Sequence, residues 1–107
     1  AMVQKLYRMI RVAMVFGLTS GDGIAAAMGL TRRTLNRRLG EYGTTFKAAL
    51  ATVRFEVARQ LLRDTTLPVS QIALALGYAE LAPFVRAFRR CSGQSPAGWR
   101  LGASRAA

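Results

Sequence analysis

The chain carries the same pattern of residues twice, at a nearly constant separation. Ile-Ala-Ala-Ala-Met-Gly-Leu at positions 24–30 matches Ile-Ala-Leu-Ala-Leu-Gly-Tyr at positions 72–78, an offset of 48 residues. Further along, Leu-x-Arg-x-Leu at 35–39 matches Phe-x-Arg-x-Phe at 84–88, at an offset of 49. A repeat of this kind indicates one supersecondary unit built twice. The fold is therefore expected to contain two similar units in tandem.

Each copy is predicted to be a short helix, a glycine turn and a longer basic helix. Small alanines in the short helix allow two helices to approach closely, and Gly29 and Gly77 permit a backbone turn that a Cβ would hinder. This order is typical of a helix-turn-helix, in which the second helix enters the major groove of DNA. The repeat therefore predicts two helix-turn-helix units.

The rest of the sequence fits an all-α fold of about seven helices. Proline occurs only at 68, 83 and 96, no run alternates in the manner of a strand, and apolar residues recur at helical spacing. The predicted helices cover about 2–16, 22–29, 31–42, 45–64, 70–76, 81–91 and a last short segment opened by Ser95 and Pro96. Their predicted N-caps are Asp22, Thr31, Thr44 or Thr45, and Ser70.

Glycine and proline also divide the chain into parts. We expect a first helix-turn-helix subdomain at 2–43, a linking helix at 44–64, a second helix-turn-helix subdomain at 65–102 and a tail at 103–107. A helix from Thr45 to Arg63 is roughly 28 Å long at about 1.5 Å per residue, close to the roughly 34 Å between successive major-groove faces. One chain is thereby predicted to imitate a helix-turn-helix dimer.

Apolar residues at helical spacing indicate the core. In the first helix the apolar face consists of Leu6, Met9, Ile10, Ala13 and Val15. The linking helix directs inward Phe46, Leu50, Val53, Val57, Leu61 and Leu62. In and beside the repeats, the residues that we expect in the core are Leu35, Leu39, Tyr78, Phe84, Phe88 and Trp99. The lone Cys91 is predicted to be a partly buried, inert thiol.

The charge of the chain indicates a polyanionic partner. Lys and Arg number 16 against 5 Asp and Glu, which gives a net charge of +11. Most of these cations are Arg, whose planar fork of donors suits phosphates and the edge of guanine, although a genome rich in G and C also raises the Arg content. The chain has no His and one Cys, which argues against catalysis, a zinc cluster and an internal disulfide. No cofactor is implied.

A basic stripe on the first predicted helix has three possible interpretations. Lys5, Arg8 and Arg11 can form a solvated face, contact phosphates beside the first unit, or be covered by a further domain. We rank the solvated face first. The apolar run at 12–18 is too short for a membrane span or a signal peptide, so we expect no membrane partner and a cytoplasmic, nucleoid-associated location.

The second copy resembles a known family. The segments Val-Ser-Gln-Ile-Ala-Leu-Ala-Leu-Gly-Tyr at 69–78, Phe-Val-Arg-Ala-Phe-Arg-Arg at 84–90 and Gly-Gln-Ser-Pro-Ala-Gly-Trp-Arg at 93–100 are similar to the signature of the AraC/XylS transcription regulators. The first copy is similar to the first helix-turn-helix of that family. The resemblance covers about 6–100 and implies a seven-helix domain, with its third and sixth helices in adjacent major grooves of double-stranded DNA. It also implies, in the same full-length protein, a separate effector-binding or dimerisation domain, and RNA polymerase as a partner.

The resemblance assigns residues to the DNA interface by their position in the motif. On the first basic helix, the residues that would face the bases are Arg33, Asn36 and Arg37. Those that would lie nearer the phosphates are Thr31, Arg32 and Arg38. Facing the bases from the second would be Leu81, Ala82, Val85 and Arg86, with Arg89 and Arg90 further along. The chain departs from the common pattern at Pro83 and Cys91.

Pro83 and Glu80 define the expected start of the second basic helix. Proline fits only in the first helical turn, whose N–H groups lack intrahelical partners, so this helix is predicted to begin at Glu80 or Leu81. Glu80 is predicted to cap it near the positive end of the helix dipole rather than to read cytosine.

Two other classes of function compete with DNA binding. A helical protein-interaction module would use the positive charge to bind an acidic partner. An enzyme is the weakest alternative, because the chain has neither His nor clustered carboxylates.

Overall fold

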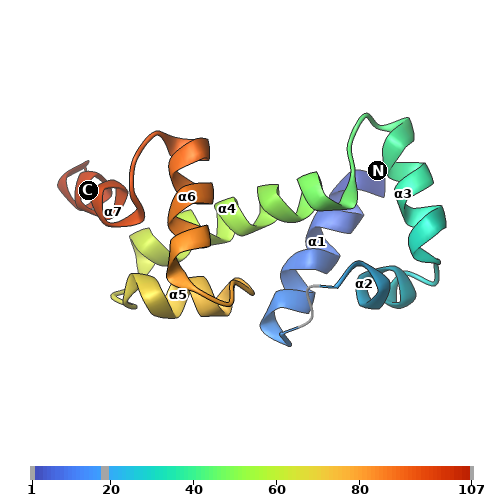
Figure 1. Ribbon diagram of the computed structural model, residues 1–107, viewed down its shortest axis with the longest axis horizontal. Helices are drawn as coiled ribbons and strands as arrows, with labels where there is room; N and C mark the ends of the chain where they lie inside the picture. Colours follow the sequence, from blue (N-terminus) through green and yellow to red (C-terminus); the bar gives the residue numbers. More distant parts are fainter. Residues whose placement is uncertain (1, 18–19, 107) are drawn as a thin grey trace. The chain divides into compact units, whose positions relative to one another are not determined.

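The computed structural model describes residues 2–17 and 20–106, and these form helices and connections without a strand (Figure 1). The helices are α1 (Met2–Val15), α2 (Gly21–Ala27), α3 (Arg32–Glu41), α4 (Phe46–Asp64), α5 (Val69–Ala75), α6 (Leu81–Ser92) and α7 (Pro96–Ala106). The all-α prediction is confirmed. The last helix is longer than expected, because α7 extends into the segment predicted as a tail.

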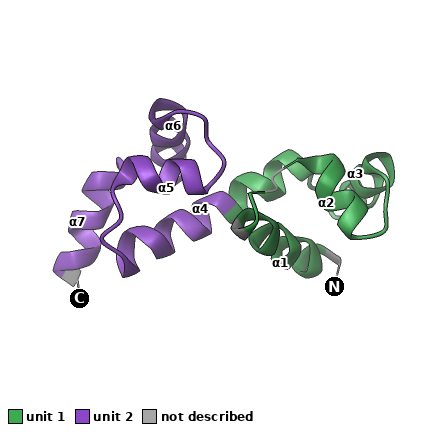
Figure 2. Ribbon diagram, turned by 90° about the horizontal axis from the view of Figure 1, so that it is seen from below, with its two compact units in different colours: residues 1–53 green, residues 54–107 purple. Residues whose placement is uncertain are grey.

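The chain forms two compact units, residues 1–53 and residues 54–107 (Figure 2). The boundary falls inside α4, so this helix contributes its first part to one unit and its second part to the other. In the first unit α2 packs against α3 and α1. In the second unit α5 packs against α6, and α6 packs against α7. Each unit thus contains one of the two predicted helix-turn-helix pairs.

The first unit has a small aliphatic core. Leu6 and Ile10 of α1 are fully buried, as are Leu35 and Leu39 of α3, and Ile24 of α2 is 1% exposed. The predicted apolar face of α1 is only partly correct. Met9 and Ala13 are half-buried, Met14 is buried although it was not predicted, and the side chain of Val15 lies outside those described.

The second unit has an aromatic core centred on Phe88. The Phe88 ring lies 5.1 Å from Phe55, 5.9 Å from Phe84 and 6.0 Å from Trp99, measured between ring centroids. Phe84 and Phe88 are buried as predicted, whereas Tyr78 and Trp99 are only half-buried. In α4, Phe46, Leu50, Val53 and Leu62 are buried, while Val57 and Leu61 are half-buried.

The two helix-turn-helix turns have the same backbone geometry. Gly29 and Gly77 have φ of 73° and 91°, which a residue with a Cβ rarely adopts. The next N–H donates to the carbonyl five residues earlier, from Leu30 to Ala25 at 2.8 Å and from Tyr78 to Ala73 at 3.0 Å. This is the Schellman arrangement, which ends a helix and satisfies its last carbonyls. The repeat in sequence is therefore a repeat in structure.

The caps correct several sequence predictions. Thr31 caps α3 as predicted, and Thr45 caps α4 by accepting the Ala48 N–H at 3.1 Å. The cap of α2 is Ser20, whose Oγ accepts the Gly23 N–H at 3.1 Å, while Asp22 lies in the first turn of the helix.

The second unit differs further from the predicted caps. Helix α5 begins after Pro68, so Ser70 is already inside it. Glu80 stands at the N-cap of α6 but makes no side-chain capping hydrogen bond. Pro83 lies in the first turn of α6, as its missing N–H requires. Cys91 is exposed, contrary to the prediction, because it lies in the last turn of α6, where little packs over it.

Candidate nucleic-acid interface

Helix α3 presents a basic face opposite its buried face. Leu35 and Leu39 lie one turn apart and are fully buried. Arg37 lies between them in sequence and therefore about half a turn away, on the exposed side. Arg33 is one turn before Arg37 on the same side, and Asn36 flanks this pair. These three predicted base-facing residues are exposed together on one side of α3.

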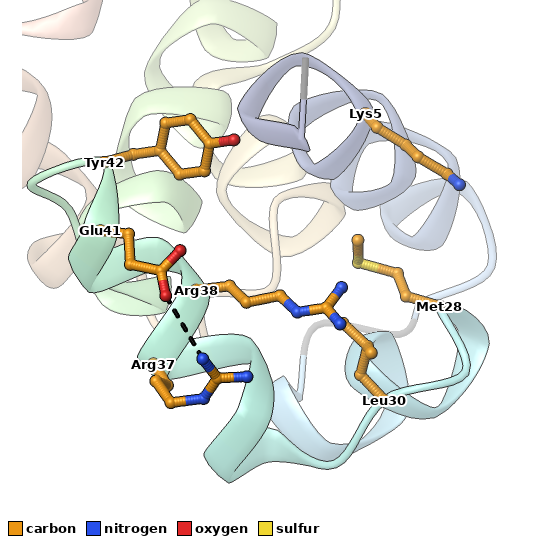
Figure 3. Close-up of a pocket in the computed structure, with 7 residues that line it drawn as sticks. All are labelled: Lys5, Met28, Leu30, Arg37, Arg38, Glu41 and Tyr42. Carbon is orange, nitrogen blue, oxygen red and sulfur yellow. Dashed lines mark hydrogen bonds and ion pairs between the residues drawn. The ribbon is translucent and has the colours of Figure 1, made fainter.

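Arg37 forms an ion pair with Glu41, one turn further along α3. Its Nη1 lies 3.3 Å from Oε1 of Glu41, and the two side chains are 64% and 62% exposed (Figure 3). An exposed pair of this kind contributes only about 0.3–0.5 kcal/mol. The guanidinium of Arg37 can therefore leave Glu41 for a ligand at little cost.

The predicted phosphate contacts of α3 are held in different ways. The Thr31 hydroxyl accepts the Thr34 N–H at 3.1 Å and donates to the Thr34 hydroxyl at 3.0 Å. Arg32 packs over Gly21, where a Cβ would lie 3.0 Å from its Nε. Arg38 extends across a pocket that Lys5 and Met28 also line (Figure 3). All three residues remain exposed.

Helix α6 repeats this arrangement with a different chemistry. Phe84 and Phe88 are buried, and Arg86 lies between them in sequence and is exposed, as Arg37 is in α3. Ala82 is exposed, Leu81 is 44% exposed, and Val85 is half-buried. The accessible face near the start of α6 is therefore apolar around a single Arg, where α3 offers polar groups.

The last turn of α6 is more basic than that of α3. Arg89 and Arg90 are exposed there, where the negative end of the helix dipole favours cations. By the offset of 49, Arg90 corresponds to Glu41 of the first copy, so the two copies carry opposite charges at this position. Arg86 has no carboxylate partner among the described residues.

Two arginines that sequence analysis did not single out hold the second unit together. Arg54 of α4 donates its Nε–H to the Leu76 carbonyl at 3.0 Å, at the end of α5. Arg100 of α7 donates its Nε–H to the Leu62 carbonyl at 3.0 Å and an Nη2–H to the Thr65 carbonyl at 3.4 Å. Helical periodicity does not distinguish these arginines from exposed ones, because their partners lie 22 to 38 residues away.

Within 2–17 and 20–106, no helix is both long enough and apolar enough to cross a membrane. The described side chains include no group of three or more His, Cys, Asp or Glu that could hold a metal ion.

Paired helix-turn-helix units with exposed arginines on their second helices define a DNA-binding domain. A family model described as "Helix-turn-helix domain" matches residues 24–102. An HTH-type transcriptional regulator of Mycobacterium tuberculosis is 44% identical over 73 residues, which cover 68% of this chain and 21% of that protein. The chain spans about a fifth of the length of the curated relatives it matches.

Solved structures give the same result over nearly the whole chain. A transcriptional regulator of Chromobacterium violaceum, described as AraC-type, is 30% identical with a TM-score of 0.75 and covers 94% of this chain and 93% of that one. The DNA-binding domain of AdpA, solved with a target DNA, is 27% identical with a TM-score of 0.76, over 91% of this chain and 90% of that one. The chain belongs to the AraC-type helix-turn-helix family of transcription regulators, and it is a DNA-binding domain, not an enzyme.

Proposed function

We propose that α3 and α6 are reading helices that enter successive major grooves of one double-stranded DNA. The observation that carries this proposal is the matched position of Arg37 and Arg86. Each is exposed, and each lies opposite a pair of buried residues one turn apart. An Arg on the outer face of a recognition helix is suited to bidentate contact with guanine.

The two reading helices contribute different base contacts in this proposal. From α3, Arg33 and Arg37 read guanine and Asn36 reads adenine, since these side chains form bidentate hydrogen bonds with those bases. From α6, Arg86 reads guanine, and the remaining contacts are apolar contacts to thymine methyl groups by Leu81, Ala82 and Val85. Phosphate contacts are assigned to Thr31, Arg32, Arg38, Arg89 and Arg90.

The domain organisation and the wider role are part of the same proposal. We assign the first helix-turn-helix to 2–43, the linking helix to 44–64 and the second to 65–102. The relatives are about five times longer than the matched segment, which supports a separate effector-binding or dimerisation domain. One relative, from Rhodococcus, is named a transcriptional activator. On that basis we assign the protein to transcription regulation, with RNA polymerase as a partner. We place it in the cytoplasm, bound to the nucleoid.

Selection of bound duplexes from a random library tests the proposal directly. We expect one enriched site that spans about two major-groove turns, with different half-sites. The matched control is the Arg37→Ala/Arg86→Ala variant, which keeps both buried pairs and should enrich the site much more weakly, because it lacks two bidentate contacts. A protein-interaction module would bind duplexes without preference. The absence of an enriched site for the unaltered domain would refute the proposal.

A further inference from the structure

Helix α1 carries two apolar stripes, and only one of them is used by the core. Leu6, Ile10 and Met14 recur every four residues and are at most 8% exposed. The second stripe consists of Met9, Val12 and Ala13 together with Phe16, the residue that follows α1, at the i, i+3, i+4, i+7 spacing of a helix face. A helix on the surface of a small domain needs one apolar stripe to pack. The second stripe therefore requires a separate explanation.

The second stripe lies at the surface. Val12 is 57% exposed and Phe16 is 73% exposed, while Met9 and Ala13 are half-buried. Together with Ala27 of α2 they line a groove of about 460 Å³. Apolar side chains gathered around one open groove form a surface that a partner can cover.

Positive charge marks one end of the groove. Lys5 and Arg8 also line it, each one turn before an apolar residue of the stripe, Met9 and Val12 respectively. Both cations are exposed, and neither has a carboxylate partner in the part of the chain that the structure describes. The groove thus runs from a cationic end to an apolar end.

DNA binding does not account for this groove. None of its lining residues is among those assigned to DNA. Helix α1 also lies outside residues 24–102, which the family model matches. A second copy packed with its α1 against this α1 does not suit the groove either, because the cations that line the groove are Lys5 and Arg8 and no acid lines it. Two α1 helices face to face would oppose like charges.

We propose that the α1 groove binds an amphipathic α-helix of a partner protein. The partner helix presents apolar residues at i, i+3, i+4 and i+7 to Met9, Val12 and Phe16, and Asp or Glu to Lys5 and Arg8. This is helix-in-groove recognition, in which the apolar anchors supply affinity and the charges set orientation. The groove and the reading helices share no residue, although Lys5 also lines the pocket that Arg37 and Arg38 border.

A displayed library of helical peptides tests the proposal. The peptides carry Leu at i, i+3, i+4 and i+7, and their other positions are random. We expect selection on the domain to enrich peptides with Asp or Glu clustered at one end. Their affinity should fall at least about tenfold for the Val12→Ser/Phe16→Ser variant, since both changes remove apolar anchors. Selection on a Lys5→Glu/Arg8→Glu variant should enrich Lys and Arg instead.

Matched controls distinguish peptide binding in the groove from non-specific hydrophobic binding and from misfolding of the variant. Leu74 and Leu101 are 57% and 60% exposed and lie outside the groove, so Leu74→Ser/Leu101→Ser should leave peptide affinity unchanged. The Val12→Ser/Phe16→Ser variant should keep the duplex affinity of the unaltered domain. Equal binding of the enriched peptides to this variant, or enrichment without acidic residues, would overturn the proposal. So would a dimer in sedimentation that Val12→Ser/Phe16→Ser abolishes, because the occupant would then be a second copy.

Discussion

The guanidinium of Arg54 lies over the ring of Tyr78, with Cζ 4.7 Å from the ring centroid. The same guanidinium donates to the Leu76 carbonyl, and the Tyr78 ring lies 5.5 Å from the ring of Phe84 in α6. One side chain of α4 therefore contacts the end of α5 and the residue that follows the glycine turn. Through Tyr78 it also supports the first buried residue of the second reading helix.

This relationship predicts strong coupling between Arg54 and Tyr78. At the offset of 48, the first copy has Leu6 and Leu30 in their places, so the same fold accepts an apolar pair. Arg54→Leu alone should cost about 2–3 kcal/mol of unfolding free energy, because it removes a charge-assisted hydrogen bond and a cation–π contact. Arg54→Leu/Tyr78→Leu should cost less than the sum of the single changes, by about 0.5–2 kcal/mol. Urea denaturation of the four proteins measures this, and additive costs would contradict it.

The reading helices should differ in what they contribute to specificity. Arg37→Ala should relax base preference in the first half-site by about 1–3 kcal/mol, because it removes a bidentate contact. Arg89→Ala should weaken binding to all sequences about equally, since we assign Arg89 to phosphates. The affinities of both variants for a set of duplexes with single-base changes give the comparison. Loss of preference only in the second half-site on changing Arg37 would show that the assignment is wrong.

The ion pair at the end of α3 should oppose DNA binding slightly. Glu41 brings a negative charge within 3.3 Å of Arg37, whereas the second copy has Arg90 at the corresponding position. Glu41→Gln should therefore tighten duplex binding about two- to fivefold at low salt, with little change in stability. Fluorescence anisotropy at two salt concentrations is the measurement. Weaker binding by the variant would mean that Glu41 orients Arg37 for its contact.

Affinity for DNA should depend strongly on salt. If the basic helices and their flanks neutralise about six to eight phosphates, log Kd against log salt concentration should have a slope of magnitude roughly 5 to 7. Arg89→Ala should reduce that magnitude by roughly one unit. A magnitude below about 2 for the unaltered domain is incompatible with this docking.

The isolated domain should bind DNA as a monomer. The two helix-turn-helix units already lie in one chain, so the binding site should be asymmetric and need no second subunit. Sedimentation of the domain on its selected duplex reports the stoichiometry. A stable dimer on a palindromic site is the result that this prediction forbids.

Local features of the sequence determined the secondary structure and which side of each reading helix is buried. Gly29 and Gly77 end their helices because each adopts a positive φ, a property of the residue itself. Leu35 and Leu39, and likewise Phe84 and Phe88, are buried because residues four apart share a helix face. The exposure of Arg37 and Arg86 follows from the same periodicity. The choice of Ser20 over Asp22 as a cap did not follow, since it depends on the exact first turn of α2.

Only the tertiary structure decided which contacts connect distant parts of the chain. The partners of Arg54 and Arg100 are carbonyls 22 to 38 residues away, and the helical period carries no information at that separation. Along α1 and the residue after it the sequence shows two apolar stripes, but only the packing of the first unit determined that Leu6 and Ile10 are buried and that Phe16 is not. Burial depends on which neighbour covers a side chain, and the neighbours are set by the fold rather than by the helix that carries the residue.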